Sequence, residues 1–147
     1  MMKRILLCLL LVGCLAGCGR AYFVHEPVDL VNSTQGVGSV LFECTGLEQP
    51  TEVIGHYITV DDRPPIYVEA FSKLRVIIEE GRHTLHIVSV GARVRPFYKE
   101  GGAPDRNKIY EYGKPAVASL FMVEDGAAIV RYKTPAARDV AGQIVVL

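Results

Sequence analysis

The sequence predicts an all-β fold, a single small β-sandwich, and three observations lead to that prediction. From Val37 onward apolar and polar residues alternate with a period of two over short runs, as expected of strands with one buried face. Turn-forming pairs separate these runs, among them Asp61-Asp62, Pro64-Pro65 and Glu80-Gly81. No stretch shows the apolar period of a long amphipathic helix. Short alternating strands joined by turns are typical of a sandwich.

The predicted strands follow one another along the chain. In residues 54–60 one face carries Ile54, Ile58 and Val60, and the other carries Tyr57 and Thr59. The same alternation places Leu74, Val76 and Ile78 on one face of the next run, and Leu85 with Ile87 on one face of the run after it. Later strands are predicted at Val117–Glu124, Ala127–Lys133 and Gln143–Leu147. The only candidate for a helical turn is Glu69–Leu74.

The histidines of the predicted strands favour structural roles. Gly81 tolerates a positive φ and predicts a tight hairpin, so His83 stands at a strand start, where its ring can bond a turn carbonyl or a carboxylate. A metal site from His83 and His86 is disfavoured, because strand positions three apart point to opposite faces. His56 is in phase with Ile54 and Ile58, which indicates a core or rim position.

Cys44 lies in phase with Val40 and Phe42, which predicts a buried small apolar residue. No basic residue within four positions lowers its pKa, so a nucleophile is disfavoured. The alternative is an exposed thiol that forms an intermolecular disulfide. Neither a Gly-x-Ser-x-Gly elbow nor a phosphate-binding loop is present, and the glycines of Gly36–Val40 are interpreted as a turn.

The N-terminal segment has the features of an export signal. Met1–Arg4 is basic, and Ile5–Val12 is an uncharged apolar run too short to span a membrane. Leu15-Ala16-Gly17-Cys18 resembles the bacterial lipobox, in which the thiol is acylated before cleavage in front of the cysteine. Leu11-Val12-Gly13-Cys14 is a poorer lipobox, and an ordinarily cleaved or uncleaved signal is a further alternative. We expect lipidation at Cys18.

Lipidation at Cys18 divides the chain into residues 1–17, a signal peptide, residues 18–36, a lipidated tether with a short strand at Ala21–Val24, and residues 37–147, the sandwich domain. The whole chain has 16 basic and 16 acidic residues, and loss of Lys3 and Arg4 leaves a slightly acidic protein. A chain with so little net charge has no overall positive electrostatic potential that would attract nucleic acid. Cys44 alone cannot form an internal disulfide once Cys18 is acylated.

A diacylglycerol and an amide-linked acyl chain at Cys18 anchor a protein stably in a bilayer. Gly19, rather than aspartate, follows that cysteine. In enteric-type sorting an aspartate there retains lipoproteins at the inner membrane. The lipobox resemblance therefore implies the outer membrane, with the protein facing the periplasm.

The segments around residues 54–133 resemble the PEGA-type β-sandwich repeat. Three segments show this resemblance: a strand ending in Tyr57–Arg63, then Leu74–Ile87 with its Glu-Gly-x-His-Thr turn, and then Phe121–Tyr132. The last segment is similar to one found in a family of small bacterial lipoproteins of unknown function. Asp62 departs from the glycine of the pattern, and Ala127-Ala128 replace a polar and aromatic pair. The resemblance implies a fold and an envelope location, and it implies no catalytic residue.

Residues 91–115 form a long connection that combines cations with aromatic rings, a combination that suits anionic, glycan, protein or lipid surfaces. The candidate partner-binding residues are Arg93, Arg95, Phe97, Tyr98, Lys99, Arg106, Lys108, Tyr110 and Tyr112. The alternative is that the aromatics extend the core through a protruding hairpin.

These features predict a membrane-anchored envelope lipoprotein, without cofactor or metal, that serves as a non-catalytic binding or accessory module. Its expected partners are the lipid bilayer, through acylated Cys18, and another envelope protein or a cell-wall polymer. The alternative is a small periplasmic enzyme or enzyme inhibitor whose site shows no sequence motif.

Overall fold

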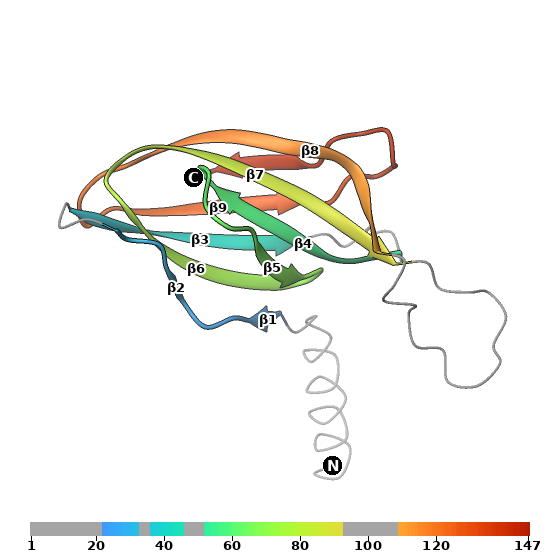
Figure 1. Ribbon diagram of the computed structural model, residues 1–147, viewed down its shortest axis with the longest axis horizontal. Helices are drawn as coiled ribbons and strands as arrows, with labels where there is room; N and C mark the ends of the chain where they lie inside the picture. The colour runs from blue at the N-terminus through green and yellow to red at the C-terminus, as the bar shows by residue number, and fades with distance from the viewer. Residues whose placement is uncertain (1–21, 33–35, 46–51, 93–108) are drawn as a thin grey trace, which may run out of the picture.

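The computed structural model describes residues 22–32, 36–45, 52–92 and 109–147. Within these ranges the regular structure is entirely β, and the strands form two sheets that pack face to face (Figure 1). The predicted all-β sandwich is therefore confirmed. Among the same residues no helix has the length and apolar character needed to cross a membrane.

Sheet A contains six strands, in the order β1-β6-β3-β9-β10, with β2 also paired to β6. Their bounds are β1 Phe23–Val24, β2 Val28–Asp29, β3 Val37–Thr45, β6 Ser72–Glu79, β9 Ala127–Lys133 and β10 Gln143–Val146. β1 and β2 run parallel to β6, and β3 runs antiparallel to β6 and parallel to β9. Two short strands of the predicted tether thus lie along the edge of the sandwich.

Sheet B contains four antiparallel strands, in the order β5-β4-β7-β8. Their bounds are β4 Val53–Val60, β5 Ile66–Glu69, β7 Gly81–Ala92 and β8 Ile109–Met122. β8 begins eight residues before the predicted strand at Val117, because its first half pairs with β7 from Ala92↔Ile109 onward. The predicted strand Ala127–Lys133 coincides with β9.

The core lies between the two sheets, and the alternation in the sequence identified most of its side chains. Its fully buried members include Val40, Phe42, Cys44, Ile58, Val60, Leu74, Val76, Ile78, Leu85 and Ile87. Ile54 is the exception, because a bulge shifts the register between Val53 and Gly55 and leaves Ile54 half-buried while Val53 is buried. The predicted burial of Cys44 is confirmed, and burial raises the pKa of its thiol to about 12.

The turn at Glu80-Gly81 is not the predicted hairpin. Gly81 does take a positive φ of 127°, but β6 belongs to sheet A and β7 to sheet B, so the turn carries the chain from one sheet to the other (Figure 1). Alternation shows which side chains of a strand are buried, and it does not show which strand is the neighbour. The hairpin prediction was wrong for that reason.

The predicted helical turn at Glu69–Leu74 is also wrong. β5 ends at Glu69 and β6 begins at Ser72, and the two bend residues between them again move the chain from sheet B to sheet A. The Ser72 hydroxyl donates a hydrogen bond of 2.8 Å to the Glu69 carbonyl, which closes this bend. A side-chain bond of this kind competes with helix formation.

A small polar network is enclosed in the core. His56 on β4 is fully buried, with Nδ1 3.1 Å from Ser89 Oγ on β7 and Nε2 3.3 Å from the Ala70 carbonyl oxygen. Ser89 Oγ is in turn 2.8 Å from the hydroxyl of Tyr132 on β9, whose ring meets the imidazole edge-on. Buried polar groups need such partners. The network joins the two sheets through hydrogen bonds as well as apolar contact.

Candidate functional site

Seven of the predicted partner-binding residues lie outside the described residues. They are Arg93, Arg95, Phe97, Tyr98, Lys99, Arg106 and Lys108. The lipidation site Cys18 also lies outside them. The other two candidates, Tyr110 and Tyr112, belong to β8 and can be placed.

Tyr112 is buried, with 5% of its surface exposed, so its ring extends the core and is not presented to a partner. Tyr110 is half-buried and donates a hydrogen bond to the Glu52 carboxylate. Arg138 bonds the same carboxylate and the Tyr110 hydroxyl, and its guanidinium lies 4.9 Å from the centre of the Tyr110 ring. Burial, followed by the neighbouring Glu52 carboxylate, raises the pKa of Tyr110. The Tyr110 hydroxyl and ring therefore contact Glu52 and Arg138 of the same chain.

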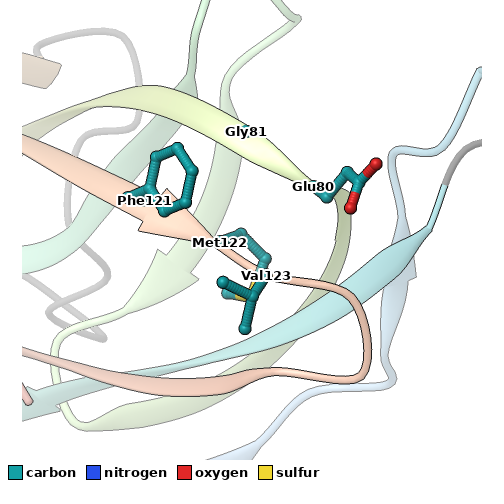
Figure 2. A pocket seen from close by; sticks show the side chains of 5 residues that line it. All are labelled: Glu80, Gly81, Phe121, Met122 and Val123. Carbon is teal, nitrogen blue, oxygen red and sulfur yellow. The ribbon is translucent and has the colours of Figure 1, made fainter.

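A second location was not anticipated from the sequence. At the corner where β6 passes into β7, an open pocket of about 340 Å³ is lined by Glu80, Gly81, Phe121, Met122 and Val123 (Figure 2). Gly81 pairs with Met122 across the β7–β8 ladder, and no atom lies within 4 Å of the place where a Cβ on Gly81 would stand. The missing side chain of Gly81 therefore leaves the hollow open.

Two apolar side chains stand beside this hollow in contact with solvent. Phe121 is 69% exposed and Val123 is 55% exposed. Figure 2 shows the Glu80 carboxylate directed away from the Phe121 ring, so the apolar side chains form one side of the pocket and the charge forms its rim. Exposed apolar side chains next to a hollow are a feature of protein interaction sites.

The corner end of the sandwich is acidic. The turns after β4, β6 and β8 meet there. The backbone N–H groups of Asp61, Glu80 and Asp125 donate hydrogen bonds to the carbonyl oxygens of Thr84, Gly36 and Val37, respectively. The acidic residues of these turns and the adjoining strand end are Asp61, Asp62, Glu79, Glu80, Glu124 and Asp125. Only two arginines accompany them in the described turns and strand ends, Arg63 and Arg82. A ligand of this corner therefore needs cationic groups around an apolar one.

His83 connects two turns of the corner through hydrogen bonds of its ring. Its Nδ1 lies 2.8 Å from Asp61 Oδ2, and its Nε2 lies 2.8 Å from the Glu79 carbonyl oxygen. The predicted bonding of His83 to a turn carbonyl or carboxylate is therefore confirmed, and both acceptors are present. Asp61 also accepts the backbone N–H of Thr84 at 2.8 Å, and Glu79 pairs with Arg63 at 3.3 Å. His86 is exposed on the opposite face of β7, as the strand geometry predicted.

The Asp61 carboxylate is stabilised in its charged form. Burial by itself raises the pKa of Asp61, but the hydrogen bonds from His83 and Thr84 and the charges of His83 and Arg63 together lower it below its usual value. Asp61 has a positive φ of 53°, a conformation that aspartate and asparagine tolerate better than most residues. The residue type at position 61 thus serves both the turn and the network.

We expect Asp61→Asn to lower the free energy of unfolding by about 1–2 kcal/mol at neutral pH, because the substitution keeps the backbone conformation but removes the charged acceptor. A depressed carboxylate pKa contributes stability above about pH 4 that is lost as pH falls through the folded-state value, so the difference from the original protein shrinks in acid. Urea unfolding at pH 7 and pH 3 measures both effects. Asp62→Asn is the matched control, since Asp62 is an exposed neighbour in the same turn, and equal losses for the two variants would refute the role of Asp61.

The described residues contain no group of three or more histidine, cysteine, aspartate or glutamate side chains that could hold a metal ion. Their one described cysteine, Cys44, is buried. The chemistry that the corner offers is therefore apolar contact flanked by carboxylates.

The fold and this surface define a small all-β sandwich protein with an acidic corner pocket. Comparisons of the chain with protein-family models, curated proteins and solved structures find no match. The resemblance to the PEGA-type repeat is consequently a proposal that depends on the sequence motifs.

Proposed function

We propose that this chain is an acylated bacterial envelope protein whose β-sandwich is a non-catalytic module that binds another envelope protein. The lipobox-like Leu15–Cys18 and the basic and apolar segment before it support export and acylation. The sandwich begins at β1, five residues after Cys18, so acylation would hold the domain close to the bilayer. The lipobox resemblance and Gly19 favour the outer membrane, with the domain in the periplasm.

The single observation that carries the binding role is the corner pocket with the exposed Phe121 and Val123. It lies beyond the last residue of β6, whereas β1 pairs with the first two residues of that strand. Eight strand residues separate these ends by about 23 Å. A protein anchored before β1 would therefore present the corner away from its point of attachment.

The acidic rim selects the chemistry of the partner. An exposed apolar side chain flanked by lysine or arginine fits a hollow lined by Phe121, Met122 and Val123. Glu80 borders this hollow, and Glu124 and Asp125 follow Val123 in the adjoining turn. A partner protein with such a segment combines burial of the apolar group with attraction at the rim. The PEGA-type resemblance supports the same class of function, because it implies a sandwich domain without catalytic residues.

Photo-crosslinking in intact cells tests this proposal. With a photoreactive amino acid in place of Phe121, we expect a discrete protein adduct, and we expect none with the same amino acid in place of Val140, which is similarly exposed outside the corner pocket. Phe121→Ala should weaken capture by about 30-fold, the effect of losing a typical interface anchor of about 2 kcal/mol.

Because Phe121 is largely exposed, the Phe121→Ala protein should unfold at the same urea concentration as the original. An adduct that a muramidase shortens would identify a cell-wall polymer instead of a protein. Equal adducts at positions 121 and 140, or none at position 121, would eliminate the corner as the binding site.

A further inference from the structure

The outer face of sheet A carries a group of cations at the end of β6 opposite to the acidic corner. Cationic side chains project from β6 and β9 at the end where β1 joins the sheet: Lys73, Arg75, Arg131 and Lys133. One carboxylate, Glu43 on β3, lies between two of them and bonds Lys73 Nζ at 2.9 Å and Arg131 Nε at 3.0 Å. The Glu43 side chain is only 13% exposed, so the cations and not the carboxylate meet the solvent.

The residues that enter the sheet beside these cations are apolar and exposed. Tyr22, Phe23 and Val24 all have large exposed surfaces, and Phe23 is 55% exposed. Phe23 and Val24 pair with Ser72 and Lys73 of β6, and the Lys73 ammonium lies 4.9 Å from the centre of the Tyr22 ring. Aromatic and cationic side chains side by side are typical of residues at the headgroup level of a membrane.

The length of chain before β1 limits how far this surface can be from the bilayer. Tyr22 is four positions after Cys18, and a fully extended chain covers at most about 3.6 Å per position, which gives about 14 Å. One headgroup layer is roughly 5–8 Å thick, so Tyr22 can lie at most about one Debye length beyond the outer limit of that layer. An acyl anchor at Cys18 therefore holds the β1 edge at the membrane surface, where the four cations are within reach of lipid phosphates.

We infer that the β1 edge and the adjoining cationic face of sheet A form a second membrane contact, which binds the headgroups of anionic phospholipids in the bilayer that carries the anchor. The inference rests on the acylation of Cys18 proposed above. Anionic headgroups attract cations within a Debye length of the surface, and each such cation strengthens binding by roughly five-fold. The contact orients the sandwich, so that the acidic corner at the far end of β6 points away from the lipid that would repel it.

The chain contains no tryptophan, so a single substitution provides a site-specific reporter. The full acylated chain with Phe23→Trp is reconstituted with vesicles of phosphatidylcholine alone, or of phosphatidylcholine mixed with phosphatidylglycerol. We expect the emission of the Phe23→Trp protein to shift to shorter wavelength, with quenching by brominated lipid, only when phosphatidylglycerol is present. The same chain with Phe121→Trp reports on the corner pocket and should respond to neither vesicle.

Charge-reversed pairs supply the matched control. Arg75→Glu with Lys133→Glu, both exposed on sheet A, should abolish the response of the Phe23→Trp protein. Arg82→Glu with Lys114→Glu, which makes the same change of charge at exposed positions of sheet B, should leave it intact. Raised salt should weaken the response as the Arg75 and Lys133 substitutions do.

The two proposals fail differently. A chain that does not float with phosphatidylcholine vesicles has no working anchor, which refutes the acylation proposal. Its response to phosphatidylglycerol then still reports whether the cationic face binds headgroups. A chain that floats with both vesicles while the Phe23→Trp reporter is unchanged by phosphatidylglycerol, or that loses its response equally with both charge-reversed pairs, overturns the inferred membrane contact.

Discussion

Cys18→Ala should replace the processed, acylated protein with an unprocessed precursor or a soluble chain, which is the largest effect that we expect from any single substitution. The thiol of Cys18 is the proposed attachment point of the diacylglycerol, and without acylation the lipobox is not cleaved by the lipoprotein peptidase. A single remaining contact of modest strength does not replace covalent acyl chains. The change is measured by fractionation of cells together with the intact mass of the chain, and high salt is used to suppress the proposed headgroup contact of sheet A.

Cys14→Ala is the matched control, because Cys14 ends the poorer lipobox four residues earlier. We expect its mass and its location to equal those of the original protein after processing. A Cys18→Ala chain that is processed and membrane-bound as before would refute Cys18 as the lipidation site. If Cys14→Ala instead abolishes attachment, the tether is four residues longer than proposed.

Acidification from pH 7 to pH 4 should cost about 3 kcal/mol of stability through His56 alone. Burial between the sheets, only partly offset by the hydrogen bond to the Ala70 carbonyl, lowers the pKa of His56 to about 4. In the unfolded chain a histidine titrates near pH 6.5. Because the folded-state pKa is the lower one, the stability is fully present above about pH 6.5 and is lost as pH falls toward 4.

Comparison with a variant that cannot titrate isolates this contribution. His56→Gln should be less stable than the original protein at pH 7, because it disturbs the bonds to Ser89 and the Ala70 carbonyl, but it should lose about 3 kcal/mol less between pH 7 and pH 4. Urea unfolding at several pH values gives the two slopes. His86→Gln, at an exposed position of β7, should keep the original slope. Equal slopes for all three proteins would show that His56 does not protonate on unfolding.

The local chemistry of the sequence determined which side chains are buried on most strands. A strand of period two has one inner face, so the burial of Cys44 beside Phe42 and of Leu85 beside Ile87 followed from position alone. The bonding of His83 was predictable for a similar reason, because a strand that begins at a turn places its first side chains next to the acceptors of that turn. Ile54 was assigned to the wrong face because of the bulge before Gly55. The alternation of apolar and polar residues in the sequence does not show where one extra residue is inserted into a strand.

The candidate site depended on contacts that no local pattern contains. The corner pocket joins Glu80-Gly81 to Phe121–Val123, which are forty residues apart and meet only because β7 pairs with β8. The same pairing extends β8 to Ile109 and buries Tyr112. Tyr112 had been a candidate for partner binding only because residues 91–115 are rich in cations and aromatic rings. Aromatic residues suit a core and an interface equally, so their position in the sheet decides between the two.

The sequence by itself therefore determined an all-β chain, the inner face of most strands and the lipobox-like motif that predicts its location, because each depends on residues close together in the chain. Only the tertiary structure decided which strands are neighbours and where the chain changes sheets. Turns such as Glu80-Gly81 and the bend after Glu69 are compatible with a hairpin or a crossover, and the burial of both inner faces against each other selects the crossover. That selection places acidic turns at one end of the sandwich and cations beside β1, and so separates the proposed partner site from the proposed membrane contact.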